Sequence, residues 1–320
     1  MDLKKAQYFF LRKSALRCLR ILLIDTREGH FCLFEHSFPA ITFDSVTSIQ
    51  QAAAAVCAAD ALLITAGAGM GVDSGLPDFR GNDGFWKAYP VAARLGLSFV
   101  ELANPAWFEK DPHLAWAFYG HRLNLYRRTM PHPGFATLLE WAAEKSEGYF
   151  VFTSNVDGHF QRSGFDADRV VECHGSIHHF QCTDGCAGNI WEAGEECVTV
   201  DEIVFRAANP LPRCRDCGAM ARPNILMFGD GSWVADRSHA QEGRFSQWLR
   251  TLEKKSARLT IIELGAGTAV PTIRYTSESV ARRLRGNLIR INPREAHVPE
   301  GCFSVATGAL DGIRQLEEAL

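Results

Sequence analysis

Four cysteines form two closely spaced pairs in the middle of the chain. Cys182 and Cys186 have a CxxxC spacing, and Cys214 and Cys217 have a CxxC spacing. Two such pairs around a loop-rich segment supply the four thiolates of a tetrahedral zinc site. Because four thiolates leave no open coordination position, this zinc would be structural rather than catalytic. Cys197 lies between the pairs and is the rival ligand.

A second group of chemically capable residues follows a short apolar run that ends at Thr65. Gly67, Gly69 and Gly71 come next, and glycines at this spacing allow a tight turn and the close approach of a pyrophosphate to the main chain. A glycine-rich turn by itself is also common as plain structure. The segment 74–80 (SGLPDFR) adds a proline turn, an acid, an aromatic ring and a guanidinium. This combination favours a charged, ribose-bearing ligand.

A histidine follows another apolar run. His174 comes directly after the sequence VVEC and precedes Gly175. This position is the carboxyl end of a predicted strand, where α/β proteins bind their ligands. Other histidines lie nearby, and an isolated histidine is more often structural, so it is the position after the strand that singles out His174.

The elements that must position these residues are indicated by the hydrophobic pattern. Continuous apolar runs predict buried strands at 61–65, 149–153, 169–173, 259–264 and 287–291. Helical patterns lie between them at 48–60, 133–145 and 277–285. This alternation predicts an α/β fold with a doubly wound, mostly parallel, Rossmann-like sheet.

Two stretches interrupt this alternation. Residues 84–130 are rich in aromatic side chains and mostly helical in pattern, whereas residues 180–222 are rich in Cys, Gly and Pro. We expect a helical insertion and a zinc-binding insertion that together form a smaller lobe of a catalytic domain spanning 46–320. Residues 1–45 show no clear period, although 21–34 could form a small hairpin, and we expect an accessory extension there.

Composition excludes several classes of protein. With 320 residues, 47% apolar and 22% charged, the chain has the composition of an ordinary globular protein. A formal net charge of -3 without a long basic run argues against a nucleic-acid partner. No signal peptide is indicated, so we expect a cytoplasmic protein with no membrane partner. Ten cysteines in such a chain favour metal ligands and buried thiols over disulfides.

Several motifs of this chain occur together in one family. They are Gly67 to Gly69, Ser74 to Arg80, Thr153 to Asp157, His174-Gly175, the paired cysteines, Phe228-Gly229, Gly265 to Thr268 and Ile291-Asn292. In these motifs the sequence resembles the sirtuin family of NAD-dependent protein deacylases, as a bacterial-type member. The resemblance spans roughly residues 48 to 315.

The resemblance implies a role for each matching position. It implies that NAD is consumed, and that His174 is the general base that takes a proton from a ribose hydroxyl after nicotinamide has left. Asn155 and Asp157 would line the nicotinamide pocket and complete the catalytic set. Phe228 and Gly229 would contact the acyl-lysine. The cofactor-binding set that it implies is Ala66, Gly67, Ala68, Gly69, Asp78, Phe79, Arg80, Ser154, Asn155, Asp157, Gly265, Gly267, Thr268 and Asn292.

The chain departs from the family pattern at several of these motifs. The usual Gln before Asn-x-Asp is Ser154, whose shorter side chain cannot reach the ribose in the same way, and this leaves the reaction type open. Gly71, Ala269 and Asp230 each remove or shorten a hydrogen-bonding group. We therefore expect NAD to be bound more loosely or in a differently shaped site.

One residue pair bears on the acyl group. Tyr119 and Arg122 lie three residues apart on a predicted helix, so they share a face and could bind a carboxylate through charge-assisted hydrogen bonds. The pair resembles the Tyr-x-x-Arg pair of sirtuins that accept succinyl or malonyl lysine. The alternative is that Tyr119 packs in the small lobe and Arg122 is solvated.

These observations predict an NAD-dependent protein-lysine deacylase. Deacetylation is the expected reaction, and removal of succinyl or malonyl groups is the alternative. The enzyme would use NAD as co-substrate, hold one structural zinc, act on acyl-lysine proteins and release nicotinamide and O-acyl-ADP-ribose. One alternative is an NAD-dependent mono-ADP-ribosyltransferase or NAD hydrolase, and another is a non-catalytic NAD-sensing module. The presence of His174 favours deacylation, the reaction that most needs a general base. The oligomeric state stays open.

Overall fold

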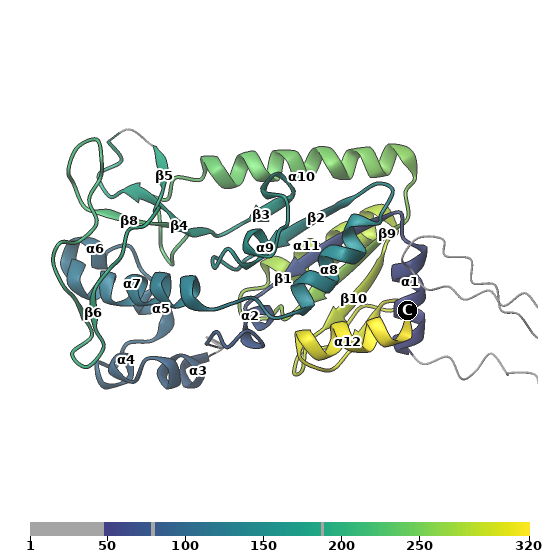
Figure 1. The fold of residues 1–320 in the computed structure, drawn as a ribbon, viewed down its shortest axis with the longest axis horizontal. Coiled ribbons are helices and arrows are strands. Elements are labelled where there is room, and N and C mark those ends of the chain that lie inside the picture. The colour runs from purple at the N-terminus through teal and green to yellow at the C-terminus, as the bar shows by residue number, and fades with distance from the viewer. Residues whose placement is uncertain (1–47, 78–80, 187–188) are drawn as a thin grey trace, which may run out of the picture.

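Two lobes of different construction make up the part of the chain that the structure describes (Figure 1). This structure is a computed structural model, and it describes residues 48–77, 81–186 and 189–320. The larger lobe is built on a parallel sheet, and the smaller lobe combines short helices with antiparallel strands. The predicted extension at 1–45, with its hairpin, lies outside the described residues.

The large lobe contains a six-stranded sheet in the order β11-β10-β9-β1-β2-β3. Every neighbouring pair in it is parallel. The predicted fold class, a doubly wound α/β sheet with a smaller lobe, is therefore confirmed. The strands are β1 (Ala61–Ala66), β2 (Tyr149–Thr153), β3 (Val170–Glu172), β9 (Leu259–Leu264), β10 (Asn287–Ile291) and β11 (Phe303–Val305).

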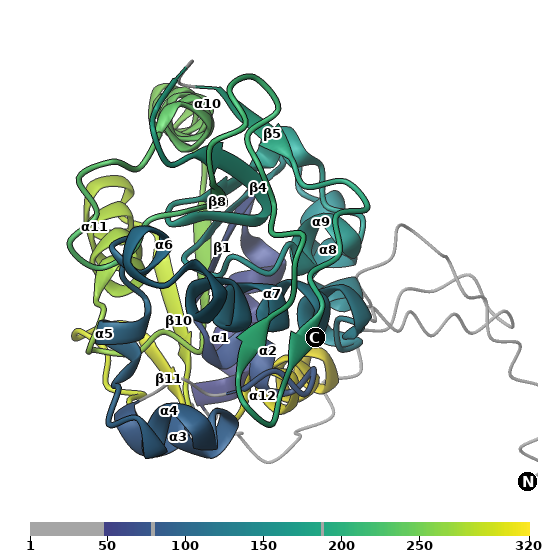
Figure 2. The ribbon, with the colours of Figure 1, turned by 90° about the vertical axis from the view of Figure 1, so that its left-hand side faces the viewer.

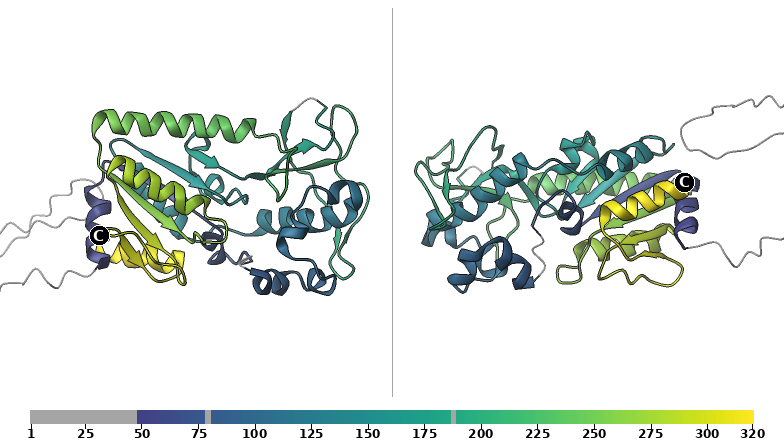
Figure 3. Two further views of the ribbon diagram at one scale, coloured as in Figure 1. Left: turned by 180° about the vertical axis from the view of Figure 1, so that it is seen from behind. Right: turned by 60° about the horizontal axis from the view of Figure 1, so that its bottom comes forward.

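Helices cover both faces of this sheet, which explains why its central strands are apolar at every position. Leu62 and Ile64 of β1 pack on one face against α1 (Ser48–Ala58), α8 (Gly134–Ala143) and α12 (Ala309–Ala319). Ala61 and Leu63 pack on the other face against α10 (Asp236–Lys255) and α11 (Thr272–Leu284). The two helix layers can be followed in Figure 3.

The small lobe, seen from its own side in Figure 2, has a separate apolar core. Its three-stranded antiparallel sheet has the order β5-β4-β8, and a second sheet pairs β6 with β7. The strands are β4 (Gly175–Cys182), β5 (Ile190–Glu192), β6 (Val200–Asp201), β7 (Arg206–Ala207) and β8 (Ala221–Ile225). The helices are α3 (Gly81–Ala88), α4 (Pro90–Arg94), α5 (Phe99–Leu102), α6 (Trp107–Lys110) and α7 (Pro112–Arg128).

Three short elements lie beside the strands of the large sheet. They are α2 (Gly69–Val72), α9 (His159–Arg162) and the 3-10 turn η2 (Ala167–Arg169). In Figure 1, α2 and α9, which follow β1 and β2, lie between the sheet and the small lobe. The carboxyl ends of the strands therefore face the boundary between the lobes.

Some elements were not predicted. Helix α10 is twenty residues long but is largely polar and buries few apolar side chains, among them Phe245, Leu249 and Leu252. Strand β4 reads HHFQC over its second half, which is too polar to be recognised as a strand. Among the described residues, no helix is both long enough and apolar enough to cross a membrane.

Candidate active site

Two glycine-containing loops meet at the carboxyl ends of β1 and β9. The amide of Gly67 donates to the carbonyl of Leu264 (3.0 Å), and the amide of Gly69 donates to that of Gly265 (3.0 Å). Gly265 has a φ of +61°, and a Cβ there would lie 2.4 Å from the Cα of Gly69. A Cβ on Gly67 would lie 2.9 Å from the Cα of Ala266. The close packing of the two loops thus requires glycine at both positions, whether or not a ligand is bound.

The Asn155 to Asp157 segment is joined to the first of these loops. The amide of Ser154 donates to the carbonyl of Ala66 (3.1 Å), and the side-chain Nδ2 of Asn155 donates to the carbonyl of Gly67 (3.0 Å). Asp157 is buried, and its Oδ1 accepts from the amide of His159 (2.9 Å). The structure therefore brings these three predicted residues together at the carboxyl ends of β1 and β2.

His174 lies in the two-residue link between β3 and β4. Its ring is half-buried, and burial lowers its pKa below the ordinary value for histidine. The next residue, Gly175, has a φ of +77°, and a Cβ there would lie only 2.0 Å from the carbonyl oxygen of Asn224. The preceding thiol is buried, and this raises the pKa of Cys173 to about 12, so it is not a nucleophile.

The residues predicted for the adenosine half lie at the ends of β9 and β10. Asn292 is fully buried and donates to the carbonyl of Ala266 (2.8 Å), while its Oδ1 accepts from the amides of Arg294 and Glu295 (both 3.0 Å). The Glu295 carboxylate accepts from the amide of Thr268 (3.2 Å) and from its hydroxyl. Asn292 therefore shapes the loop around Thr268. A Cβ on Gly267 would lie 3.3 Å from the Glu295 carboxylate.

Glu295 was not predicted as a site residue. Its only signal in the sequence is an acid three positions after Asn292, which by itself has no specific meaning. Three other predicted residues, Asp78, Phe79 and Arg80, lie outside the described part of the chain. Of the predicted set, Ala66 is the last residue of β1, and Ala68 is the N-cap residue of α2.

The four cysteines that were predicted as zinc ligands form one cluster. The sulfur atoms of Cys182, Cys186, Cys214 and Cys217 all lie within 4.8 Å of one another. Two of the Sγ–Sγ distances are 3.6 Å. A tetrahedral zinc with Zn–S bonds of about 2.3 Å would separate its ligands by about 3.8 Å, so the cluster fits such an ion. The rival Cys197 lies outside the cluster, with its Sγ 3.8 Å from Asn124 Oδ1.

The comparison with known families agrees with this geometry. The model of the Sir2 family matches residues 67–255, which include the glycine loop, His174 and all four cysteines. The chain belongs to the Sir2 family.

Individual Sir2-family relatives cover most of the chain. An NAD-dependent protein deacylase of Aquifex aeolicus is 29% identical over 232 residues, which is 72% of this chain and 83% of that one. An NAD-dependent protein deacylase of Pyrococcus abyssi is 31% identical over 232 residues, covering 72% and 81% of the two chains. Among solved structures, a Sir2 homologue in complex with NAD has a TM-score of 0.60 at 25% identity, over 84% of this chain and 93% of that one.

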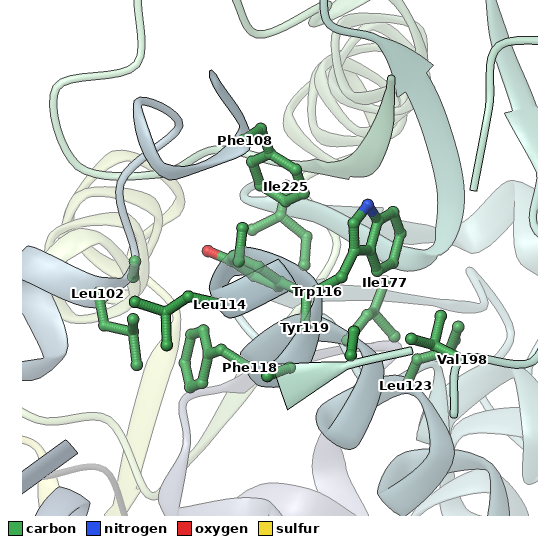
Figure 4. Close-up of a cluster of buried hydrophobic side chains, with 14 of the residues drawn as sticks. Leu102, Phe108, Leu114, Trp116, Phe118, Tyr119, Leu123, Ile177, Val198 and Ile225 are labelled. Carbon is green, nitrogen blue, oxygen red and sulfur yellow. The ribbon is translucent and has the colours of Figure 1, made fainter. Parts of the chain in front are cut away.

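The pair proposed to bind the acyl group lies inside the small lobe of this Sir2-family chain. Tyr119 is packed among apolar side chains of α7 and its neighbours (Figure 4), and burial raises the pKa of its phenol. Arg122 is buried as well, so the expectation that it is solvated is wrong. Its Nε and Nη2 donate to the hydroxyl of Tyr126 (3.0 and 2.9 Å).

The guanidinium of Arg122 also lies against aromatic rings. Its central carbon is 5.2 Å from the ring centre of Phe118 and 5.7 Å from that of Tyr119. Tyr126 was not singled out in the sequence, although its spacing of four from Arg122 places the two on one helix face. Tyr119 and Arg122 therefore belong to a larger buried group, in which one guanidinium contacts several aromatic rings.

The residues predicted to contact acyl-lysine follow β8. The amide of Phe228 donates to the carbonyl of Ala103 (2.9 Å), and its ring centre lies 5.9 Å from that of Phe99. Gly229 has a φ of +68°. Asp230, which is shorter than the usual residue of the family pattern, forms a buried ion pair with Arg222.

Proposed function

We propose that this chain is an NAD-dependent protein-lysine deacylase that releases nicotinamide and O-acyl-ADP-ribose. The observation that carries the proposal is the position of His174, a half-buried histidine at the carboxyl edge of the sheet, in the same edge region as the joined Gly67 and Gly265 loops. The deacylase relatives from Aquifex aeolicus and Pyrococcus abyssi support the same reading. Acyl-lysine proteins are the proposed substrates, in the cytoplasm.

The residues at the edge of the sheet fit NAD. The main chain at Gly67 to Gly69 would hold the phosphates, and the loops at Gly265 to Thr268 and Asn292 would hold the adenosine half. Asn155 and Asp157 would take the nicotinamide side. When bound, NAD supplies the ribose carbon that loses nicotinamide and receives the acyl oxygen.

His174 is the proposed general base. Burial disfavours the charged imidazolium and lowers its pKa, so the ring is neutral near pH 7 and has a nitrogen free of a proton. In that state the ring can accept a proton from a ribose hydroxyl. Activity should therefore fall as the pH drops through the lowered pKa, on the acid side of about 6.5.

The proposed domain organisation assigns the small lobe to the insertions at 84–130 and 180–222 within a catalytic domain at 46–320. A zinc held by four thiolates would have no open position for substrate. Its role would be to fix the fold of the second insertion, while the chemistry occurs at the edge of the large sheet.

Mono-ADP-ribosyl transfer or NAD hydrolysis is the second candidate. It is favoured by Ser154, whose side chain is shorter than the Gln expected there. The same pocket would release nicotinamide, but a protein side chain or water would receive the ADP-ribose. A non-catalytic NAD sensor would bind NAD and release no nicotinamide at all.

Product analysis of a histidine variant tests the proposal. The full chain is incubated with NAD and with acetyl, succinyl or unmodified lysine peptides, while nicotinamide and O-acyl-ADP-ribose are followed by mass spectrometry. His174→Ala should reduce O-acyl-ADP-ribose formation by about 100-fold or more while NAD affinity is retained. His239→Ala, at an exposed position on α10, is the matched control.

Other outcomes would identify the alternatives. Turnover that survives His174→Ala contradicts the assignment of the base. Nicotinamide release without O-acyl-ADP-ribose in the unaltered chain contradicts deacylation and supports ADP-ribosyl transfer or hydrolysis. NAD binding with no nicotinamide release supports the sensor.

A further inference from the structure

The loop at residues 226–234 connects β8 to α10 and carries the candidate substrate residues Phe228 and Gly229. It has no helix or strand of its own. Its first amide, that of Leu226, donates to the carbonyl of His174 (3.0 Å). The amide of Phe228 donates to the carbonyl of Ala103 on the small lobe (2.9 Å). The loop therefore runs from the candidate base to the helices beside the acyl site.

A fully buried ion pair joins this loop to β8. Nη1 and Nη2 of Arg222 donate to the two carboxylate oxygens of Asp230, at 2.8 and 3.0 Å. The two side chains are 1% and 0% exposed. The same carboxylate accepts from the amides of Met227 (3.3 Å) and Ser232 (3.1 Å). One side chain thus joins the beginning and the end of the loop to β8.

A pair of buried amide side chains holds the other half of the loop. Gln181 and Asn224 are both fully buried, and Asn224 Nδ2 donates to Gln181 Oε1 (2.9 Å). Gln181 Nε2 donates to the carbonyl of Ser232 (2.8 Å), and its Oε1 accepts from the amide of Val234 (3.1 Å). Asn224 Nδ2 also donates to the carbonyl of Val234 (2.8 Å).

These contacts make the shape of the loop costly to change. A carboxylate or guanidinium that is buried without its partner is strongly unfavourable, and a buried amide that loses its hydrogen bonds is unfavourable as well. The loop can therefore move only by separating charges or leaving amides unsatisfied. A loop fixed before binding requires less ordering when a ligand arrives, which favours affinity.

The ion pair also lies close to the acyl candidate. Arg222 Nη1 lies 3.6 Å from Met227 Sδ, and Met227 belongs to the same buried apolar cluster as Tyr119. The pair and the aromatic group of α7 therefore share one buried region behind the loop.

We propose that Arg222, Asp230 and Gln181 are positioning residues that hold the 226–234 loop in the shape that accepts an acyl-lysine peptide. Arg222 and Gln181 lie beneath the loop and Asp230 belongs to it, so the three act through the loop: they set peptide affinity and leave NAD affinity unchanged. This inference rests on the proposed function, because it takes the loop to be the peptide site.

Peptide binding by variants of the full chain tests the inference. Fluorescent acetyl-lysine and succinyl-lysine peptides are titrated with the chain in the presence of ADP-ribose, and NAD affinity is measured separately. Asp230→Asn, nearly the same in shape, should raise the peptide Kd by about tenfold and change the NAD Kd by less than about twofold. Asp230→Glu keeps the charge and should raise the peptide Kd less than Asp230→Asn does. Arg283→Gln, which breaks an exposed ion pair with Glu253, is the control.

A second substitution ensures that the test does not depend on a single variant. Gln181→Met removes the other set of tethers and should also weaken peptide binding selectively. Thermal unfolding and zinc content verify that each variant is folded. Unchanged peptide affinity in the folded variants, or an equal loss of peptide and NAD affinity, overturns the inference, as does an unaltered chain that binds no acyl-lysine peptide. A chain that binds peptide but forms no O-acyl-ADP-ribose contradicts the proposed function alone.

Discussion

Arg122 illustrates how a single charged residue can be kept inside an apolar lobe. Removing a guanidinium from water is costly unless hydrogen bonds and favourable electrostatics replace hydration. Tyr126 accepts two of its hydrogen bonds, and three aromatic rings lie within 5.7 Å of its central carbon. Cation–π contacts of this kind are stronger when water is absent. A buried cation of fixed position suits the recognition of an acidic acyl group.

The prediction at this scale concerns acyl selectivity. Arg122→Ala should lower kcat/KM for succinyl-lysine peptides by about 10- to 100-fold, because a charge-assisted hydrogen bond is lost, and should affect acetyl-lysine peptides much less. Steady-state kinetics on the two peptide series measure the ratio. Arg128→Ala, exposed on the same helix, is the control. An equal loss for both peptides would mean that Arg122 serves packing only.

The role of a residue was predictable from the sequence where that role depends on residues close by in the chain. The cysteine pairs and the glycine loop have short, specific spacings, and His174 follows a recognisable strand. Arg222 and Asp230 could not be paired in advance, because an ion pair between a strand and the loop that follows it has no spacing rule. The role of Glu295 becomes visible only in the folded chain, where its carboxylate accepts a hydrogen bond from the amide of Thr268.

At the scale of elements, the small antiparallel sheet connects the four-cysteine cluster to the 226–234 loop. Cys182 is the last residue of β4, and Cys214 and Cys217 precede β8. Gln181, next to Cys182, contacts the loop that follows β8. The position of these strands therefore determines both the geometry of the thiolates and the start of the 226–234 loop.

Removal of one thiolate should destabilise this sheet. We expect about one zinc per chain by elemental analysis, and Cys214→Ser should lose the metal and lower the Tm by about 5 °C or more, because metal binding and folding are coupled. Cys197→Ser, outside the cluster, should keep both. Purified, folded protein without zinc would contradict the four-thiolate site.

The large sheet was predictable because its central strands are buried on both faces and read as continuous apolar runs. Helix α10 was missed because its buried positions are widely spaced among polar residues, which shows that an apolar stripe of three residues is a weak signal. In the small lobe, β5, β6 and β7 have two or three residues each. Strands this short have little pattern of their own, and β6 and β7 lie against α7.

At the scale of the whole molecule, buried histidines link stability to pH. Burial lowers the pKa of His132, His159, His174 and His178, and it lowers that of His179 to about 4. Each of these rings is neutral in the folded chain at a pH where the unfolded chain would already bind a proton. The unfolded state therefore takes up more protons between the lowered pKa values and about 6.5.

The free energy of unfolding should consequently fall as the pH drops below about 6.5, by at most about 1.4 kcal/mol per pH unit for each histidine. Urea denaturation between pH 8 and pH 5 measures this slope. His239→Ala should leave it unchanged, since that ring is exposed. A stability that is flat from pH 7.5 to pH 5.5 would show that these rings are not held neutral by burial.

The link that contains His174 joins the last residue of β3 in one lobe to the first residue of β4 in the other, across only two residues. The main chain of this link is bonded to both lobes, since the amide of Cys173 donates to the carbonyl of Thr153 and the carbonyl of His174 accepts from the amide of Leu226 (both 3.0 Å). Gly175 leaves little room for movement there, because its backbone lies against Asn224. The orientation of the proposed base is therefore set jointly by the two lobes, and a substitution that shifts either sheet would reach the imidazole through the main chain.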